Sequence, residues 1–209
     1  MLRYNTFFGV GAREGATFHA AAPEIVFNSL HETVKVCQEN YASPFNCYFR
    51  TFNSAFPDTD VFFGSRGSFY DFFPKTGSFE TGPPYTEEVM ERMIYHLQSL
   101  LESKDAGPLS FVVFVPDWRE PLQKCQEIME SKDFAYTQRI IQLKGGKYFY
   151  VAGDQHKKSK ATDPKERFFS LPFETTIYIL QNELGKEKFP LTDQYIQELN
   201  RVLHLDRSS

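Results

Sequence analysis

Hydrophobic residues along the chain follow two different spacings, and the two spacings alternate. Near-continuous apolar runs, typical of strands covered on both faces of a sheet, occupy Leu109–Val115 and Thr175–Asn182. An apolar stripe at helical spacing runs through Thr86–Lys104. Strands that alternate with helices in this way predict an α/β fold.

Weaker patterns complete the alternation. We expect further strands over Val34–Ala42, Tyr136–Leu143 and Tyr148–Val151, with the last two joined as an antiparallel pair by a tight turn at Gly145-Gly146. We expect one helix that begins at Pro23, one over Cys47–Ala55, one that ends at about Ser131, and one over Leu191–Leu205. The predicted architecture is a single domain over residues 1–209. Its sheet is doubly wound and mostly parallel, with helices on both faces and the last strand inserted antiparallel.

The segment Gly82-Pro83-Pro84-Tyr85, called here the Gly-Pro-Pro-Tyr motif, separates a short strand from the helix predicted at Thr86. This places it at the carboxyl edge of the sheet, where open α/β sheets bind ligands. Prolines cannot continue a sheet ladder, so their carbonyl groups are free to accept hydrogen bonds from a ligand. Tyr85 adds a flat ring beside them. The motif predicts a site for a planar group that carries an amine, such as adenine, or else a proline-stiffened turn.

Other polar segments are expected at the same edge. The loop after the first predicted strand contains Asn46, which is either a cofactor contact or a helix N-cap. The loop around Asp58 and Asp60 combines acids with aromatic residues, and it is either structural or suited to ribose hydroxyls and an adenine ring. The predicted cofactor-binding residues are Ala42, Ser43, Pro44, Asn46, Asp58, Asp60 and Glu80.

Composition limits the classes of partner. The formal net charge of −4 argues against general electrostatic attraction to nucleic acid, so an RNA site must be a local patch. A basic cluster between residues 154 and 167 is either a solvated loop or such a patch. Trp118 and Arg119 follow the Leu109–Val115 strand and either contact a nucleotide or begin a capped helix. The predicted RNA-binding residues are Trp118, Arg119, Lys157, Lys158, Lys160 and Arg167.

The three cysteines form no C-x-x-C pair, so neither a disulfide framework nor a zinc cluster is indicated, and no metal site is predicted. No apolar run is long enough to span a bilayer, and the N-terminus lacks a signal-peptide pattern. We therefore expect an intracellular, soluble protein without a membrane partner.

Several blocks, in the same order, resemble the catalytic core of the phosphorylated CTD-interacting factor family. The matching blocks include Ala42–Phe49, Ser54–Asp60, Phe63–Gly67, Gly77–Glu80 and Pro108–Pro121. The family consists of methyltransferases that use S-adenosylmethionine to modify the exocyclic amine of a 2′-O-methylated adenosine next to the mRNA cap. The resemblance implies a Rossmann-like methyltransferase fold, S-adenosylmethionine as cofactor and capped RNA as partner. It favours the nucleus over the cytoplasm.

The resemblance also assigns roles within the motif and exposes a departure. The family motif is Asn-Pro-Pro-Phe, whose counterparts here are Gly82, Pro83, Pro84 and Tyr85. The resemblance implies that the Pro83 carbonyl accepts a hydrogen bond from the target amine and that Tyr85 stacks on the base. Gly82 has no side chain to supply the second acceptor. The alternative is therefore a catalytically weak or inactive pseudoenzyme that serves as an RNA- or protein-binding module.

Family members also carry a WW module that binds the phosphorylated tail of the polymerase. We expect no such module within the 209 residues, and on this ground polymerase-tail binding is not predicted.

Overall fold

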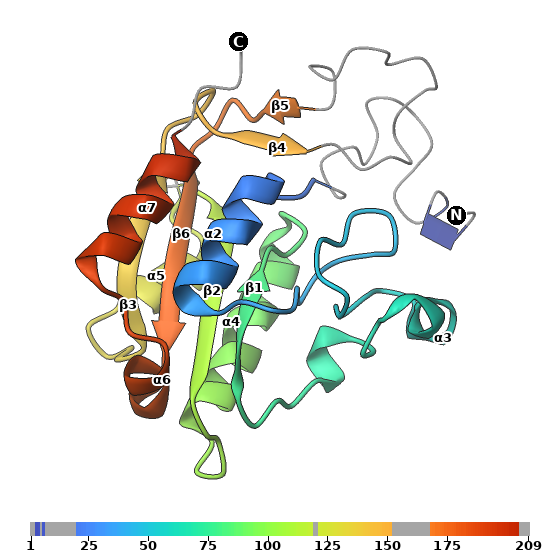
Figure 1. Cartoon of the computed structure of the whole chain (residues 1–209), viewed down its shortest axis with the longest axis horizontal. Helices are drawn as coiled ribbons and strands as arrows, with labels where there is room; N and C mark the ends of the chain where they lie inside the picture. The colour runs from blue at the N-terminus through green and yellow to red at the C-terminus, as the bar shows by residue number, and fades with distance from the viewer. Residues whose placement is uncertain (1–2, 5, 7–19, 119–120, 152–167, 205–209) are drawn as a thin grey trace.

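The structure is a computed structural model, and it describes residues 3, 4, 6, 20–118, 121–151 and 168–204. Helices and strands alternate in a mixed α/β fold (Figure 1). The helices are α2 (Glu24–Val34), α3 (Pro57–Asp60), η2 (Val61–Phe63), η3 (Phe69–Asp71), α4 (Glu87–Glu102), α5 (Lys124–Glu130), α6 (Glu183–Lys188) and α7 (Asp193–Leu203). The strands are β1 (Gly77–Thr81), β2 (Leu109–Pro116), β3 (Thr137–Leu143), β4 (Phe149–Val151), β5 (Phe168–Ser170) and β6 (Thr175–Gln181).

Four strands form the main sheet, in the order β1-β2-β6-β3. β1 pairs with β2 in parallel, while β6 runs antiparallel to both of its neighbours, β2 and β3. β1, β2 and β3 therefore point the same way. The predicted antiparallel insertion of the last strand is confirmed. The prediction of a mostly parallel sheet is corrected to a mixed sheet, because β6 contributes two antiparallel pairs.

Helices cover both faces of this sheet, and alternation along β2 explains why its whole run is apolar. Phe111 and Val113 pack with α4 and α5 on one face. Val112 and Phe114 pack with α2 and α7 on the other face. Figure 1 shows α2 and α7 in front of the sheet and α4 behind it. Each large apolar side chain that is fully buried stabilises the fold by about 1.5–3 kcal/mol.

Beyond β1 the sheet continues as single parallel bridges rather than strands. Glu39 bridges to Glu80 of β1 and also to Phe52, and Phe52 bridges to Ser65. The strand predicted over Val34–Ala42 is therefore reduced to a short extended segment. α2 extends to Val34 and ends at Lys35, whose φ is 59°.

The helix predicted over Cys47–Ala55 does not form. The backbone N–H groups of Tyr48 and Phe49 donate to the carboxylate of Glu39, and the N–H of Asn53 donates to the Glu39 carbonyl. These donors are consequently directed toward a neighbouring segment rather than toward helical carbonyls.

The predicted pairing of β3 with β4 is wrong. β3 pairs with β6, whereas β4 pairs with β5 in a separate two-stranded sheet. The turn at Gly145-Gly146 is present, with Gly146 at a φ of 72°, and its N–H donates to Leu171. Figure 1 shows β4 and β5 above the upper end of the main sheet.

The two-stranded sheet is tied to the segment that precedes α2. Ala21 and Val151 exchange both backbone hydrogen bonds, with N···O distances of 3.0 and 2.8 Å. Among the described helices, none combines the length and the apolar character needed to cross a membrane.

Candidate active site

The Gly-Pro-Pro-Tyr motif follows β1 directly and leads into α4. The Pro84 carbonyl accepts from the N–H of Thr86, at 2.8 Å, and this closes the turn before the helix. No described residue donates a hydrogen bond to the carbonyl of Pro83. The two interpretations of the motif are therefore compatible, since the turn is stiffened by proline and still leaves one carbonyl available.

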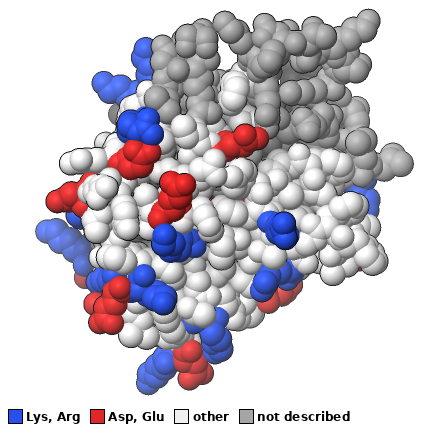
Figure 2. Space-filling view, in the orientation of Figure 1, with Lys and Arg blue, Asp and Glu red and all other residues white. Residues whose placement is uncertain are grey.

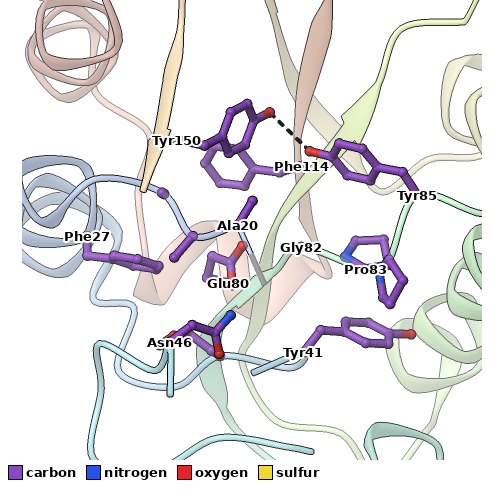
Figure 3. A pocket seen from close by; sticks show the side chains of 14 residues that line it. Ala20, Phe27, Tyr41, Asn46, Glu80, Gly82, Pro83, Tyr85, Phe114 and Tyr150 are labelled. Carbon is purple, nitrogen blue, oxygen red and sulfur yellow. Dashed lines mark hydrogen bonds between the residues drawn. The ribbon is translucent and has the colours of Figure 1, made fainter. Parts of the chain in front are cut away.

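Two adjoining cavities meet at the motif. The larger has a volume of about 210 Å³ and the smaller about 40 Å³. The residues that line both are Ala20, Tyr41, Asn46, Gly82 and Pro84. The smaller cavity, shown in Figure 3, is completed by residues from four other parts of the chain: Phe27, Glu39, Phe114 and Tyr150.

The loop that follows the Glu39 segment forms one wall of the larger cavity. Of the residues predicted to bind the cofactor, Ala42, Ser43 and Asn46 line this cavity, whereas Pro44 does not. The Asn46 side-chain oxygen accepts from both the backbone N–H and the hydroxyl of Ser43, each at 2.8 Å. No helix follows Asn46, so it closes its own loop rather than capping a helix.

Asn40 lines the larger cavity and was missed in the sequence. Its side chain is buried and its Nδ2 donates to Thr81 Oγ1 at 2.9 Å, but its Oδ1 has no partner among the described residues. A buried acceptor left without a donor costs about 1–3 kcal/mol. The cavity therefore offers an acceptor that a ligand with N–H or O–H groups would satisfy.

Aromatic side chains form the opposite wall of the larger cavity. Tyr41 donates to the hydroxyl of Tyr70 at 3.0 Å, and the Arg92 guanidinium lies 3.9 Å from the centre of the Tyr70 ring. Tyr41 also packs against Phe69, with ring centres 5.0 Å apart. Burial raises the pKa of the Tyr41 hydroxyl well above its usual value, so this hydroxyl stays protonated. Flat rings beside an unpaired acceptor suit a nucleoside, and the residues present fit an adenosine-containing cofactor.

Two buried carboxyl groups, those of Glu39 and Glu80, face the smaller cavity. Glu39 accepts two contacts from the Tyr48 N–H, at 3.0 and 2.8 Å, and one from the Phe49 N–H, at 3.2 Å. Burial raises the pKa of Glu39 to about 7, and those N–H groups partly oppose the rise. Burial, together with the charge of Glu39, raises the pKa of Glu80 well above its usual value. No lysine or arginine stands among the described residues that line this cavity.

Two contacts hold the Tyr85 side chain, one at its hydroxyl and one at its ring. Its hydroxyl contacts that of Tyr150, and its ring packs edge-on against Phe173 at 6.2 Å between centres. Phe173 in turn packs against the half-buried ring of Trp118 at 5.8 Å. Trp118 therefore belongs to an aromatic group that extends from the motif.

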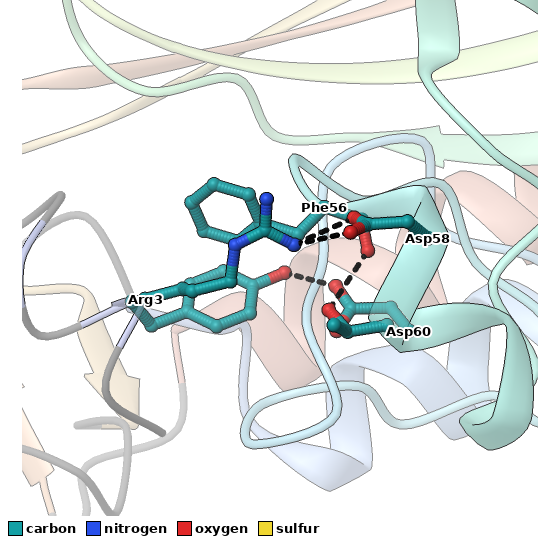
Figure 4. Close-up of polar contacts among 6 residues, drawn as sticks. Arg3, Phe56, Asp58 and Asp60 are labelled. Carbon is teal, nitrogen blue, oxygen red and sulfur yellow. Dashed lines mark hydrogen bonds and ion pairs between the residues drawn. The ribbon is translucent and has the colours of Figure 1, made fainter.

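The two acids of the Asp58–Asp60 loop line neither cavity. Asp58 is exposed and forms an ion pair with Arg3 at 2.6 Å, which lowers the pKa of its carboxyl (Figure 4). Asp60 is buried and accepts a hydrogen bond from Tyr4. Because Tyr4 itself lines the larger cavity, Asp60 is hydrogen-bonded to a residue of the cavity lining.

The other predicted residues lie outside the described part of the chain: Arg119, Lys157, Lys158, Lys160 and Arg167. On the face shown in Figure 2, the described basic and acidic side chains are interspersed rather than gathered into one basic patch. Within the described ranges, no group of three His, Cys, Asp or Glu side chains is arranged to hold a metal ion.

Residues 1–153 match a family model described as "Phosphorylated CTD interacting factor 1 WW domain". The chain is 43% identical over 198 residues to a human protein named mRNA (2'-O-methyladenosine-N(6)-)-methyltransferase, and 44% identical over 197 residues to a mouse protein of the same name. The alignments cover 95% and 94% of this chain but 27% of each relative. The chain thus spans about a quarter of the length of the curated relatives that it matches.

The family match corrects one prediction. We expected no WW module, but the model that matches residues 1–153 is described as a WW domain. The exclusion of polymerase-tail binding rested on that expected absence and is therefore withdrawn.

Proposed function

Because the chain belongs to the phosphorylated CTD interacting factor 1 family, we propose that it is an S-adenosylmethionine-dependent methyltransferase that acts on the exocyclic amine of adenosine in RNA. The proposed target is the 2′-O-methylated adenosine next to an mRNA cap, in keeping with the names of its relatives. The observation that carries the proposal is the position of the Gly-Pro-Pro-Tyr motif where two cavities meet. A nuclear location is part of the same proposal.

The sheet supports a Rossmann-like methyltransferase fold. In chain order, the segments at Glu39, Phe52 and Ser65 come first, and they continue the sheet outward from β1. Across the sheet the order is therefore the Ser65 segment, the Phe52 segment, the Glu39 segment, β1 and β2, which is the doubly wound order. Strand order reverses between the Glu39 segment and β1. Ligands of doubly wound sheets bind at this reversal, and both cavities are lined by residues that follow these two segments.

The larger cavity is the proposed site for S-adenosylmethionine, which supplies the methyl group when bound. Ala42, Ser43 and Asn46 would form its floor, and Asn40 Oδ1 would accept a hydrogen bond from it. Tyr41 and Tyr70 would contribute the rings beside the adenine. Glu80, also predicted to contact the cofactor, faces the smaller cavity instead.

The motif is the proposed site for the target base. The Pro83 carbonyl accepts a hydrogen of the amine, and the Tyr85 ring supports the face of the base. Tyr150 fixes the Tyr85 hydroxyl, so this ring is oriented before the base arrives. The chain's contribution is the position of the amine, for which a preorganised acceptor is commonly worth a hundredfold or more in rate.

The test is methyl transfer from labelled S-adenosylmethionine to short RNAs that differ only at the 5′ end. We expect label on capped RNA that begins with 2′-O-methyladenosine, and much less on the uncapped or guanosine-initiated RNA. Tyr85→Ala serves as the variant without the supporting ring. Binding of the capped RNA with no transfer would favour the pseudoenzyme, which Gly82 makes the second candidate. Equal labelling of all RNAs would overturn the cap-adjacent target.

A further inference from the structure

The carboxyl group of Glu80 occupies the space next to Gly82. Positions 80 and 82 project to the same side of an extended strand, because side chains alternate along it. A β-carbon added to Gly82 would lie 2.8 Å from Glu80 Oε1, which is closer than such carbons approach other atoms. The only other near contact would be Glu80 Cδ, at 3.8 Å. The Glu80 carboxyl thus lies where a side chain at position 82 would begin.

The sheet fixes the Glu80 backbone but leaves its carboxyl without a donor. The Glu80 N–H donates to Gln38 at 3.0 Å, and its carbonyl accepts from Asn40 at 2.8 Å. The side chain is 6% exposed, lines the smaller cavity, and accepts no hydrogen bond from any described residue. Glu39, its neighbour, already accepts backbone N–H groups. Of the two buried carboxyls, Glu80 is therefore the one with acceptor capacity to spare.

A buried acceptor of this kind needs a donor supplied from the cavity. The exocyclic amine of adenosine carries two hydrogens, and the motif itself offers one free acceptor, the Pro83 carbonyl. Glu80 stands beside Gly82, the position from which a second acceptor is missing. No described lysine or arginine lines the cavity to compete for it. A carboxyl group retains an accepting oxygen whether it is neutral or ionised.

We propose that Glu80 is the second acceptor for the target amine and replaces the side chain that position 82 lacks. Glu80 is then a catalytic residue of the base-binding site rather than a cofactor contact. This inference rests on the proposed function, because it specifies how the same site recognises its base.

The test is a binding measurement that does not depend on turnover. Two capped RNAs, one with 2′-O-methyladenosine and one with 2′-O-methylpurine riboside next to the cap, differ only by the amine. With S-adenosylhomocysteine present, we expect the wild-type chain to bind the adenosine RNA roughly tenfold more tightly. Glu80→Leu should lower this ratio severalfold, because only the Pro83 carbonyl then accepts from the amine, and it should not change the thermal shift produced by S-adenosylhomocysteine. Glu80→Gln keeps an acceptor oxygen and should retain a preference.

Position 82 provides the complementary variants. Gly82 is not among the residues with positive φ, so its backbone accepts a side chain. Gly82→Ala places a carbon against Glu80 Oε1, displaces it and adds no acceptor, so it should also lower the ratio. Gly82→Asn in the Glu80→Leu background should restore the ratio, because the shorter leucine leaves room for an amide oxygen. Ser78→Ala is the matched control, since Ser78 is on the same face of β1 and its buried hydroxyl has no partner among the described residues.

The outcomes separate the inference from the proposed function. If Glu80→Leu prefers the RNA with the amine as strongly as the wild type does, the inference is wrong. It is also wrong if Glu80→Leu loses the thermal shift with S-adenosylhomocysteine but keeps that preference. If Glu80→Leu does not fold, Gly82→Ala decides in the same way. If the chain transfers no methyl group but its preference for the amine depends on Glu80, the proposed enzymatic function is wrong and the inference is supported. If Glu80→Leu and Gly82→Ala transfer methyl groups as fast as the wild type, the enzymatic function is supported and the inference is wrong.

Discussion

The hydroxyl oxygen of Tyr85 lies 3.0 Å from that of Tyr150, and the Tyr150 hydroxyl lies 2.7 Å from Thr175 Oγ1. A hydrogen-bond chain therefore connects the Gly-Pro-Pro-Tyr motif to β4 and from there to β6. The Tyr85 ring is held in one orientation by this chain and by its edge contact with Phe173. The hydroxyl that distinguishes tyrosine from phenylalanine thus has a specific structural role at this position.

Tyr85→Phe should preserve methyl transfer and lower the free energy of unfolding by about 1 kcal/mol, because it removes one hydrogen bond and keeps the ring. Tyr85→Ala should reduce transfer by more than about a hundredfold, because the base loses its supporting face. Chemical denaturation and label transfer measure the two effects. Tyr150→Phe removes the same hydrogen bond from its other end and keeps the Tyr85 ring, so it should behave like Tyr85→Phe. Equal transfer by Tyr85→Ala and the wild type would show that the ring does not support the base.

S-adenosylhomocysteine should raise the melting temperature through linkage if the larger cavity is the cofactor site. Asn46→Ala should reduce this shift, because Asn46 closes the loop that lines the cavity. Asp60→Ala should reduce it through Tyr4, whereas Asp58→Ala should leave it unchanged, because the exposed Asp58 pairs with Arg3 and lines neither cavity. Differential scanning fluorimetry measures all three. A shift of wild-type size in Asn46→Ala would place the cofactor elsewhere.

The buried Glu39 should make stability fall as the pH rises. Burial raises its pKa from the ordinary 4.5 to about 7, so the folded chain binds more protons than the unfolded chain between these values. Its contribution is fully present below pH 4.5 and is lost on passing pH 7, at a cost of roughly 3 kcal/mol. Glu80 faces Glu39 and acts in the same direction.

Urea denaturation at several pH values between 5 and 8 checks this dependence. Glu39→Gln cannot ionise, keeps an oxygen for the Tyr48 N–H, and should flatten the fall. Glu32→Gln, on the exposed side of α2, is the control for loss of one carboxyl. A slope that is unchanged in Glu39→Gln would assign the pH dependence to other groups.

The basic cluster of the sequence leads to a separate prediction about RNA. Replacing Lys157, Lys158, Lys160 and Arg167 by glutamine should weaken binding of capped RNA and flatten its salt dependence, because fewer phosphate counterions are released. The thermal shift with S-adenosylhomocysteine should not change. Binding titrations over a range of salt concentrations test this. If the salt slope of the variant equals that of the wild type, these residues do not contact phosphate.

Local patterns predicted the elements whose form is decided locally. The apolar run of β2 and the stripe of α4 appear as expected, because each is set by the spacing of its own side chains. The helix predicted over Cys47–Ala55 fails for a reason that lies outside it, namely the capture of its N–H groups by Glu39. The β3–β4 pairing fails similarly, because β6, which is distant in the sequence, is the partner that β3 takes.

Some residues that line the two cavities are marked in the sequence by backbone chemistry, and others are revealed only by tertiary contacts. Prolines identify the Gly-Pro-Pro-Tyr motif in any context, and the loop through Asn46 follows from its place after the first segment. Asp58 and Asp60 look alike in the sequence, yet only Asp60 is buried, by contact with Tyr4. Asn40 carries no local signal at all, since its importance comes from one unpaired oxygen.

The paired backbone hydrogen bonds of Ala21 and Val151 join a wall of the smaller cavity to the strand that carries Tyr150. The two segments cannot separate from each other without breaking both bonds, so they form one cooperative unit beside the smaller cavity. A ligand that needs the cavity closed must hold this unit shut. Such a ligand stabilises the closed unit through linkage, so the amide protons of Ala21 and Val151 would exchange more slowly when it is bound.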